Sequence, residues 1–89
     1  MNVFRLYVAG TNQASEKAVR DFNDFLEGKL NGLYTLEILD MLDNPPQALE
    51  DNIIVTPTVL RVSPPPQKKV IGDIRAIDVI FEILLEGIN

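Results

Sequence analysis

The sequence predicts an α/β fold in which helices flank a mixed four-stranded sheet, with elements in the order β-α-β-α-β-β-α. Apolar runs that suit strands alternate with segments whose apolar residues recur every three or four positions, which is typical of amphipathic helices. The last two strand-like runs are separated only by a short proline-rich turn, so they should pair antiparallel. The length of 89 residues suits one domain, residues 1–89.

The central feature is residues 53–62, where an apolar run reaches a Thr-Pro-Thr turn and continues as a second apolar run. Pro57 has no N–H and cannot lie in a central ladder, so we expect it to open a strand over residues 58–62. Thr56 precedes the proline and is therefore restricted to extended conformations. The sequence leaves open whether the peptide bond between them is cis or trans.

The first elements are a strand and a helix. Residues 3–9 are rich in β-branched and aromatic side chains, and Gly10 ends this strand. A helix is expected over residues 14–28, capped by Thr11 or Asn12 and ended by the glycine that is its last residue. The apolar positions of this helix are Ala18, Val19, Phe22, Phe25 and Leu26.

A second strand and a short helix follow. Residues 33–40 form the next strand-like run, and two strands joined by a helix predict a parallel pair. The short helix is expected over residues 46–51. Asp43 or Asn44 caps it, and the prolines occupy its first turn, where a missing N–H costs little.

The last elements are a strand over residues 68–71 and a helix over residues 74–86, which Gly87 ends. The predicted order of elements is the thioredoxin-like arrangement, with helices on both faces of the sheet. The apolar face of the last helix is Ile77, Ile80, Phe81, Leu84 and Leu85.

Composition excludes several functions. The net charge is −5, from 8 basic and 13 acidic residues, which argues against a nucleic-acid binder because such proteins need a basic excess. The chain has no cysteine and no histidine, so no thiolate, disulfide, zinc–thiolate site or imidazole base is available. No signal peptide and no apolar run near the ~20 residues of a membrane span is present, so we expect a cytoplasmic protein.

Five carboxylates between residues 37 and 51 have no basic residue among them. Strand alternation puts Glu37 and Asp40 on different faces, so the carboxylates are not expected to converge on a metal. A solvated acidic surface is the simplest interpretation, and a docking patch for a basic partner is the alternative. Tyr7 and Tyr34 are expected to be half-buried. The five carboxylates are Glu37, Asp40, Asp43, Glu50 and Asp51.

Short motifs spread across nearly the whole chain resemble the circadian clock protein KaiB family. Each is weak alone, but they occur in the order and at the spacing of the family. They are Leu6-Tyr7-Val8-Ala9-Gly10, Gly32-Leu33-Tyr34, Ile38-Leu39-Asp40, Asn44-Pro45, Thr56-Pro57-Thr58, Pro64-Pro65-Pro66 and Ile71-Gly72-Asp73.

The resemblance implies a non-catalytic regulatory protein without a cofactor. KaiB-like proteins bind the ring of the ATPase KaiC and modulate its phosphorylation state or output. With KaiC they can sequester KaiA or compete with the thioredoxin-like sensor domain of the kinase SasA. Relatives outside clocks are linked to stress responses, so a stress-response or kinase-sensor interaction module is the alternative. A cysteine-less thioredoxin-like enzyme that binds glutathione through Thr11 or Ser15 is a remote one.

The resemblance also implies two folds, a thioredoxin-like monomer and a ground-state tetramer with a different carboxy-terminal half. No glycine interrupts the chain between Gly72 and Gly87, so local propensity favours the helix of the thioredoxin-like fold. We therefore predict that fold, with the tetramer fold as the alternative; the chain is expected to be a monomer or a homo-oligomer (dimer or tetramer).

The chain departs from the family at two places. The loop Thr11-Asn12-Gln13-Ala14-Ser15 lacks the proline that is usual there, and Lys68-Lys69 replaces a common Arg pair, which makes any ion pair less directional. A solvated edge strand protected by charge is the alternative interpretation of the two lysines. Gly10, Pro57, Gly72 and Asp73 are interpreted as structural motif residues. The partner-contact candidates are Lys17, Arg20, Asn52, Thr56, Lys68 and Lys69.

Overall fold

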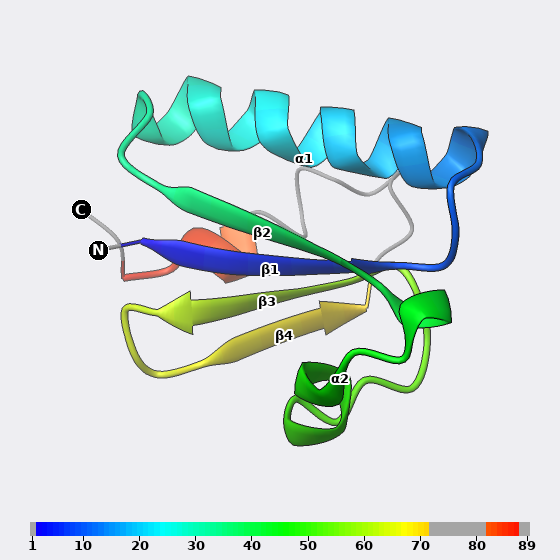
Figure 1. The fold of residues 1–89 in the computed structure, drawn as a ribbon. Coiled ribbons are helices and arrows are strands. Elements are labelled where there is room, and N and C mark those ends of the chain that lie inside the picture. The colour runs from blue at the N-terminus through cyan, green and yellow to red at the C-terminus, as the bar shows by residue number, and fades with distance from the viewer. Residues whose placement is uncertain (1, 72–81, 88–89) are drawn as a thin grey trace.

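The described part of the chain, residues 2–71 and 82–87, contains four strands that form one mixed sheet (Figure 1). The structure is a computed structural model. The strands are β1 (Val3–Val8), β2 (Thr35–Asp40), β3 (Thr58–Ser63) and β4 (Lys68–Ile71). Their order across the sheet is β2-β1-β3-β4, with β1 parallel to β2, and β3 antiparallel to both β1 and β4. This topology confirms the predicted thioredoxin-like class and both predicted strand pairings.

The long helix α1 (Gln13–Leu30) begins as predicted but ends later. Asn12 is its N-cap, and the Asn12 side chain accepts a hydrogen bond of 2.9 Å from a backbone N–H of the first turn. The predicted end at Gly28 is wrong, because the helix continues to its C-cap, Asn31, which has φ 50°. A glycine inside a helix costs only about 1 kcal/mol. The next turn recovers that cost, since Leu30 packs against the core.

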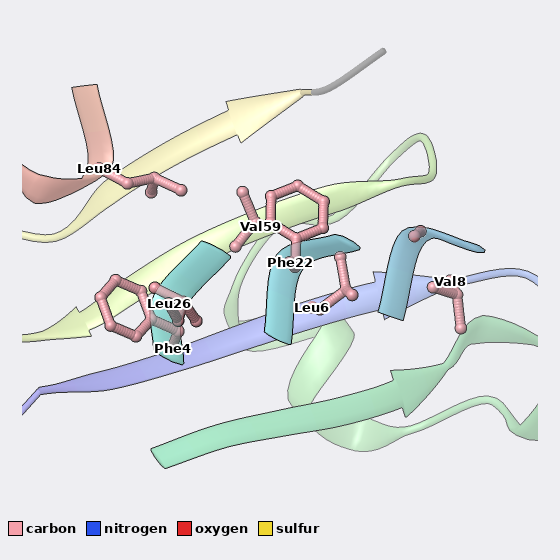
Figure 2. Packing of buried hydrophobic residues seen from close by; sticks show 8 residues of the cluster. Phe4, Leu6, Val8, Phe22, Leu26, Val59 and Leu84 are labelled. Carbon is pink, nitrogen blue, oxygen red and sulfur yellow. The ribbon is translucent and has the colours of Figure 1, made fainter. Parts of the chain in front are cut away.

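The hydrophobic core lies between α1 and one face of the sheet. Side chains alternate along β1, so every second residue points towards α1, and the predicted apolar positions of α1 meet them. Figure 2 shows phenylalanine and leucine side chains from both elements interleaved with one valine of β3. The buried members of this cluster are Phe4, Leu6, Val8, Ala18, Phe22, Leu26, Val59 and Leu84.

Most of the last predicted helix, 74–86, lies outside the described residues. Its described part, residues 82–85, is helical, and Leu84 is fully buried in the core. Gly87, the predicted end of this helix, follows with φ 82°. None of the helices within residues 2–71 and 82–87 is long and apolar enough to cross a membrane. The predicted residues that lie outside the described ranges are Gly72, Asp73, Ile77, Ile80 and Phe81.

Two short helical elements connect β2 to β3. They are the 3-10 helix η1 (Met41–Asp43), which the sequence analysis did not predict, and α2 (Pro46–Glu50). The predicted caps of α2 are therefore wrong: Asp43 belongs to η1, and Asn44 ends η1 with φ 48°. Helix α2 starts after Pro45 with no side-chain cap. Figure 1 shows α1 along one side of the sheet and α2 apart from it on the other.

Candidate partner-binding surface

Asp51, the residue directly after α2, connects the segment between β2 and β3 to the sheet. Its side chain is only 7% exposed, and its Oδ2 accepts hydrogen bonds from the Tyr7 hydroxyl at 2.5 Å and from Arg5 Nη1 at 3.2 Å. Arg5 and Tyr7 alternate with the core residues of β1, so they point to the face of the sheet opposite α1. The predicted solvated position of Asp51 is wrong, because α2 brings this carboxylate under the sheet against two donors.

Arg5 joins two of the five acidic residues. Its Nε lies 3.5 Å from Glu37 Oε2, while its Nη1 contacts Asp51. The prediction that the carboxylates do not converge is therefore wrong for this pair, although a guanidinium holds them and not a metal. Burial lowers the pKa of Arg5, but the charges of Glu37 and Asp51 outweigh that effect and raise it.

Tyr7 is fully buried, which corrects the prediction of a half-buried ring. Burial, and then the hydrogen bond to the Asp51 carboxylate, raise the pKa of the Tyr7 hydroxyl above its usual range. The hydroxyl therefore stays protonated at neutral pH and remains a donor to Asp51. Tyr34 is half-buried as predicted, and its hydroxyl contacts Asn23 and Glu27 of α1.

The loop between α2 and β3 is held at further points. Lys69 Nζ of β4 donates to the Asn52 carbonyl at 3.1 Å, and the Thr58 hydroxyl of β3 donates to the Val55 carbonyl at 2.6 Å. The Ile53 N–H bonds back to the helix at 3.0 Å. Together with Asp51, these contacts connect the loop to three of the four strands.

Helix α2 and the loop after it carry large apolar side chains that face solvent. Leu49 of α2 is 84% exposed and Ile54 of the loop is 90% exposed, and Val55 is also exposed. Ile71 is exposed as well, and it lies two residues beyond Lys69 on the same face of β4. We call Leu49, Ile54, Val55 and Ile71 the apolar patch, because the Lys69–Asn52 contact joins the end of β4 to the segment that carries the other three. Clustered exposed apolar side chains of this kind mark interaction sites more often than scattered ones do.

A cavity of about 260 Å³ lies beside the Thr56–Pro57 turn, whose peptide bond is cis. Ser15 lines it, but the Ser15 hydroxyl already donates to the Ala9 carbonyl at 3.3 Å. The Ser15 hydroxyl is therefore paired with a backbone carbonyl, whereas a nucleophilic serine pairs with a general base. The residues that line the cavity are Val8, Ala9, Asn12, Ala14, Ser15, Ala18, Thr56 and Pro57.

A second cavity of about 390 Å³ lies between α1 and β2. Its apolar floor includes Val19 and Ile38, and Arg20 lies on its rim with three acidic residues, Glu16, Asp40 and Asp43. No group of three or more metal-ligating side chains occurs in the part of the chain that the structure describes.

Comparison with known proteins identifies the family. Residues 5–84 match the KaiB domain family. The chain belongs to the KaiB family. The circadian clock oscillator protein KaiB of Acaryochloris marina is 42% identical over 97% of this chain and 89% of its own length. That of Thermosynechococcus vestitus is 44% identical over 81% of this chain and 67% of its own length.

A solved structure shares the fold of this KaiB-family chain. The N-terminal domain of Synechococcus elongatus SasA matches 99% of the chain and 87% of its own length with a TM-score of 0.72. The sequence identity is 16%, so this likeness concerns the fold alone.

The structure brings together only some of the residues that the KaiB resemblance singled out. Asn52 and Lys69 meet beside the apolar patch, and Thr56 lies in the turn that ends the loop. Lys68 points to the opposite face of β4, where its Nζ lies 3.5 Å from Glu86 Oε2. Lys17 and Arg20 are on α1, across the sheet from α2; the Lys17 ammonium contacts Asp21 at 2.6 Å.

Gly10, one of the KaiB motif residues within the described ranges, lies where the backbone conformation favours glycine. Gly10 has φ 77°, and its N–H donates to Asp40 Oδ1 at 2.8 Å. A Cβ at this position would lie 3.0 Å from the Leu42 side chain, so a larger residue does not fit without a shift. Sequence reasoning missed the apolar patch; the only signal for it was three consecutive apolar residues, 53–55, next to a turn, which period-two alternation cannot bury together.

Proposed function

We propose that this KaiB-family protein is a non-catalytic binding protein that docks on a KaiC-type ATPase ring and modulates its phosphorylation state or output. The observation that carries the proposal is the apolar patch: hydrogen bonds from Tyr7, Thr58 and Lys69 hold its loop in place while its side chains face solvent. Protein interfaces have this composition, with an apolar centre and a polar rim. Membership of the family supports the choice of partner.

The rim of the patch indicates the chemistry of the partner surface. Lys69 and Asn52 border the apolar centre, and both residues are exposed. A complementary surface therefore presents apolar side chains flanked by carboxylates or amide groups. The chain as a whole has a net charge of −5, which repels partners that are acidic throughout and so favours a local match over a general one.

A kinase-sensor interaction module is the second candidate. The observation that favours it is the fold shared with the N-terminal domain of SasA. If this protein and a SasA-like domain bind the same site on one ATPase ring, each displaces the other from that ring. A stress-response role, and partnership with a KaiA-like protein, remain further proposals from the family resemblance. All of these proposed roles require the cytoplasmic location that is expected from the sequence.

The test is binding of the purified protein to a KaiC-type ring under ATP-hydrolysing conditions, measured by biolayer interferometry. An Ile54→Ser variant should bind at least tenfold more weakly, since about 1.4 kcal/mol corresponds to a tenfold loss. Leu33→Ser is the matched control, because Leu33 is 76% exposed but lies near Asn2, at the other end of β1. Absence of binding by the wild-type chain, or equal loss in both variants, would contradict the proposal.

A further inference from the structure

We propose that Asp51 is a positioning residue for partner docking, which fixes the loop that presents the apolar patch by its contacts with Arg5 and Tyr7. This inference rests on the proposed function, because it names the residue that orders the same binding surface. The Asp51 side chain is 7% exposed and points to β1, so its proposed role is to hold the loop in place and not to contact the partner.

Helix α2 depends on such an anchor because it is too short to be stable alone. It has five residues and no side-chain N-cap, whereas isolated helices shorter than about 12 residues are marginal in water. Within α2, only Ala48 is buried. Its place on the sheet therefore depends on Ala48 and on the residue that immediately follows the helix, Asp51.

The anchor is attached to a central strand of the sheet. β1 is paired on both sides, by β2 and by β3, and Tyr7 is fully buried. Both donors converge on the same carboxylate oxygen of Asp51. Hydrogen bonds to an ionised acceptor are stronger and more directional than those between neutral groups.

Asp51 lies in the middle of the patch along the chain. Leu49 is two residues before it and Ile54 three residues after it, so fixing Asp51 restricts the positions of both exposed side chains. A loop that is ordered before binding does not lose that conformational freedom in the complex, and its affinity is correspondingly higher. The other carboxylate on Arg5, that of Glu37, belongs to β2 and has no connection to the loop.

The experiment compares two variants with two matched controls. Tyr7→Phe removes one hydroxyl and keeps the buried ring, and Asp51→Asn removes the charge with little change in shape. Amide hydrogen exchange of residues 49–56 in the free protein should become about tenfold faster in both, with the amides of β1 and β3 unchanged. Affinity for the KaiC-type ring should fall roughly three- to tenfold.

The controls separate positioning from general destabilisation. Tyr34→Phe removes a hydroxyl that contacts α1, and Glu37→Gln removes the second carboxylate on Arg5; neither should change exchange in residues 49–56. Unchanged exchange in both Tyr7→Phe and Asp51→Asn overturns the inference. Faster exchange with full affinity, while Ile54→Ser binds weakly, also overturns it and leaves the proposed function intact. Full affinity of Ile54→Ser overturns the proposed function, and the docking role of Asp51 with it.

Discussion

Replacement of Leu84 by alanine should destabilise the protein by about 3 kcal/mol. Leu84 is fully buried and connects the described end of the last helix to Phe4, Phe22, Leu26 and Val59 in the core (Figure 2). The change removes three carbons, worth about 0.8 kcal/mol each. The cavity left behind adds to this loss, so the total is about 3 kcal/mol, within the range of about 2–5 kcal/mol for buried leucines.

This loss is large compared with the stability expected for 89 residues, about 4–13 kcal/mol. Urea unfolding measures this loss: with a slope of about 1 kcal/mol/M, the midpoint should fall by about 3 M. Leu33→Ala is the control, because that side chain is exposed, and its free energy of unfolding should change by no more than about 0.5 kcal/mol. A loss below about 1 kcal/mol for Leu84→Ala would refute the packing of the last helix against the sheet.

Three further predictions concern single contacts. Arg61→Ala should lower the free energy of unfolding by at least about 2 kcal/mol, because the buried guanidinium donates to the carbonyls of residues 66, 84 and 86. Lys68→Ala removes an ion pair between a partly exposed lysine and an exposed glutamate, and it should cost less than about 1 kcal/mol in the same urea assay. Folding raises the pKa of Tyr7. The contribution of Tyr7 to stability is therefore complete below the unfolded pKa of about 10 and is lost as pH rises above that value. Urea midpoints should consequently fall less steeply between about pH 9 and pH 11 in Tyr7→Phe than in the wild type. Asn12→Ala should cost about 1 kcal/mol through loss of the N-cap of α1, and an equal loss in Thr11→Ala would show that the cap was misassigned.

The elements that were predicted well are those whose signals are local. Periodic apolar residues located α1, and a proline that cannot join a central ladder located the start of β3 at Thr58. The errors at Gly28 and Asn44 also came from local signals. A glycine is compatible with a helix interior when the next turn packs against the core. An asparagine beside prolines can end one short helix as well as begin another.

The candidate surface was predicted only in part. Asn52, Thr56 and Lys69 border the surface proposed here, but their contacts with a partner stay predictions. The apolar patch was not predicted, because exposure is not a property of a residue type. An isoleucine in an apolar run reads as core unless the path of the chain is known. Arg61 was missed for the same reason: a charged residue is expected outside, and its burial is acceptable because carbonyls at a distant helix end and at Pro66 accept its hydrogen bonds.

The sequence by itself determined the α/β class, the order of its elements, and the absence of thiol and imidazole chemistry, since these depend on composition and on short-range periodicity. The tertiary structure alone decided which polar groups are buried and which apolar groups are exposed to solvent. Asp51 meets Arg5 and Tyr7 across 46 and 44 residues of chain. No local pattern encodes a contact at that separation, because it forms only when the sheet brings its strands together and α2 is placed against the face opposite α1.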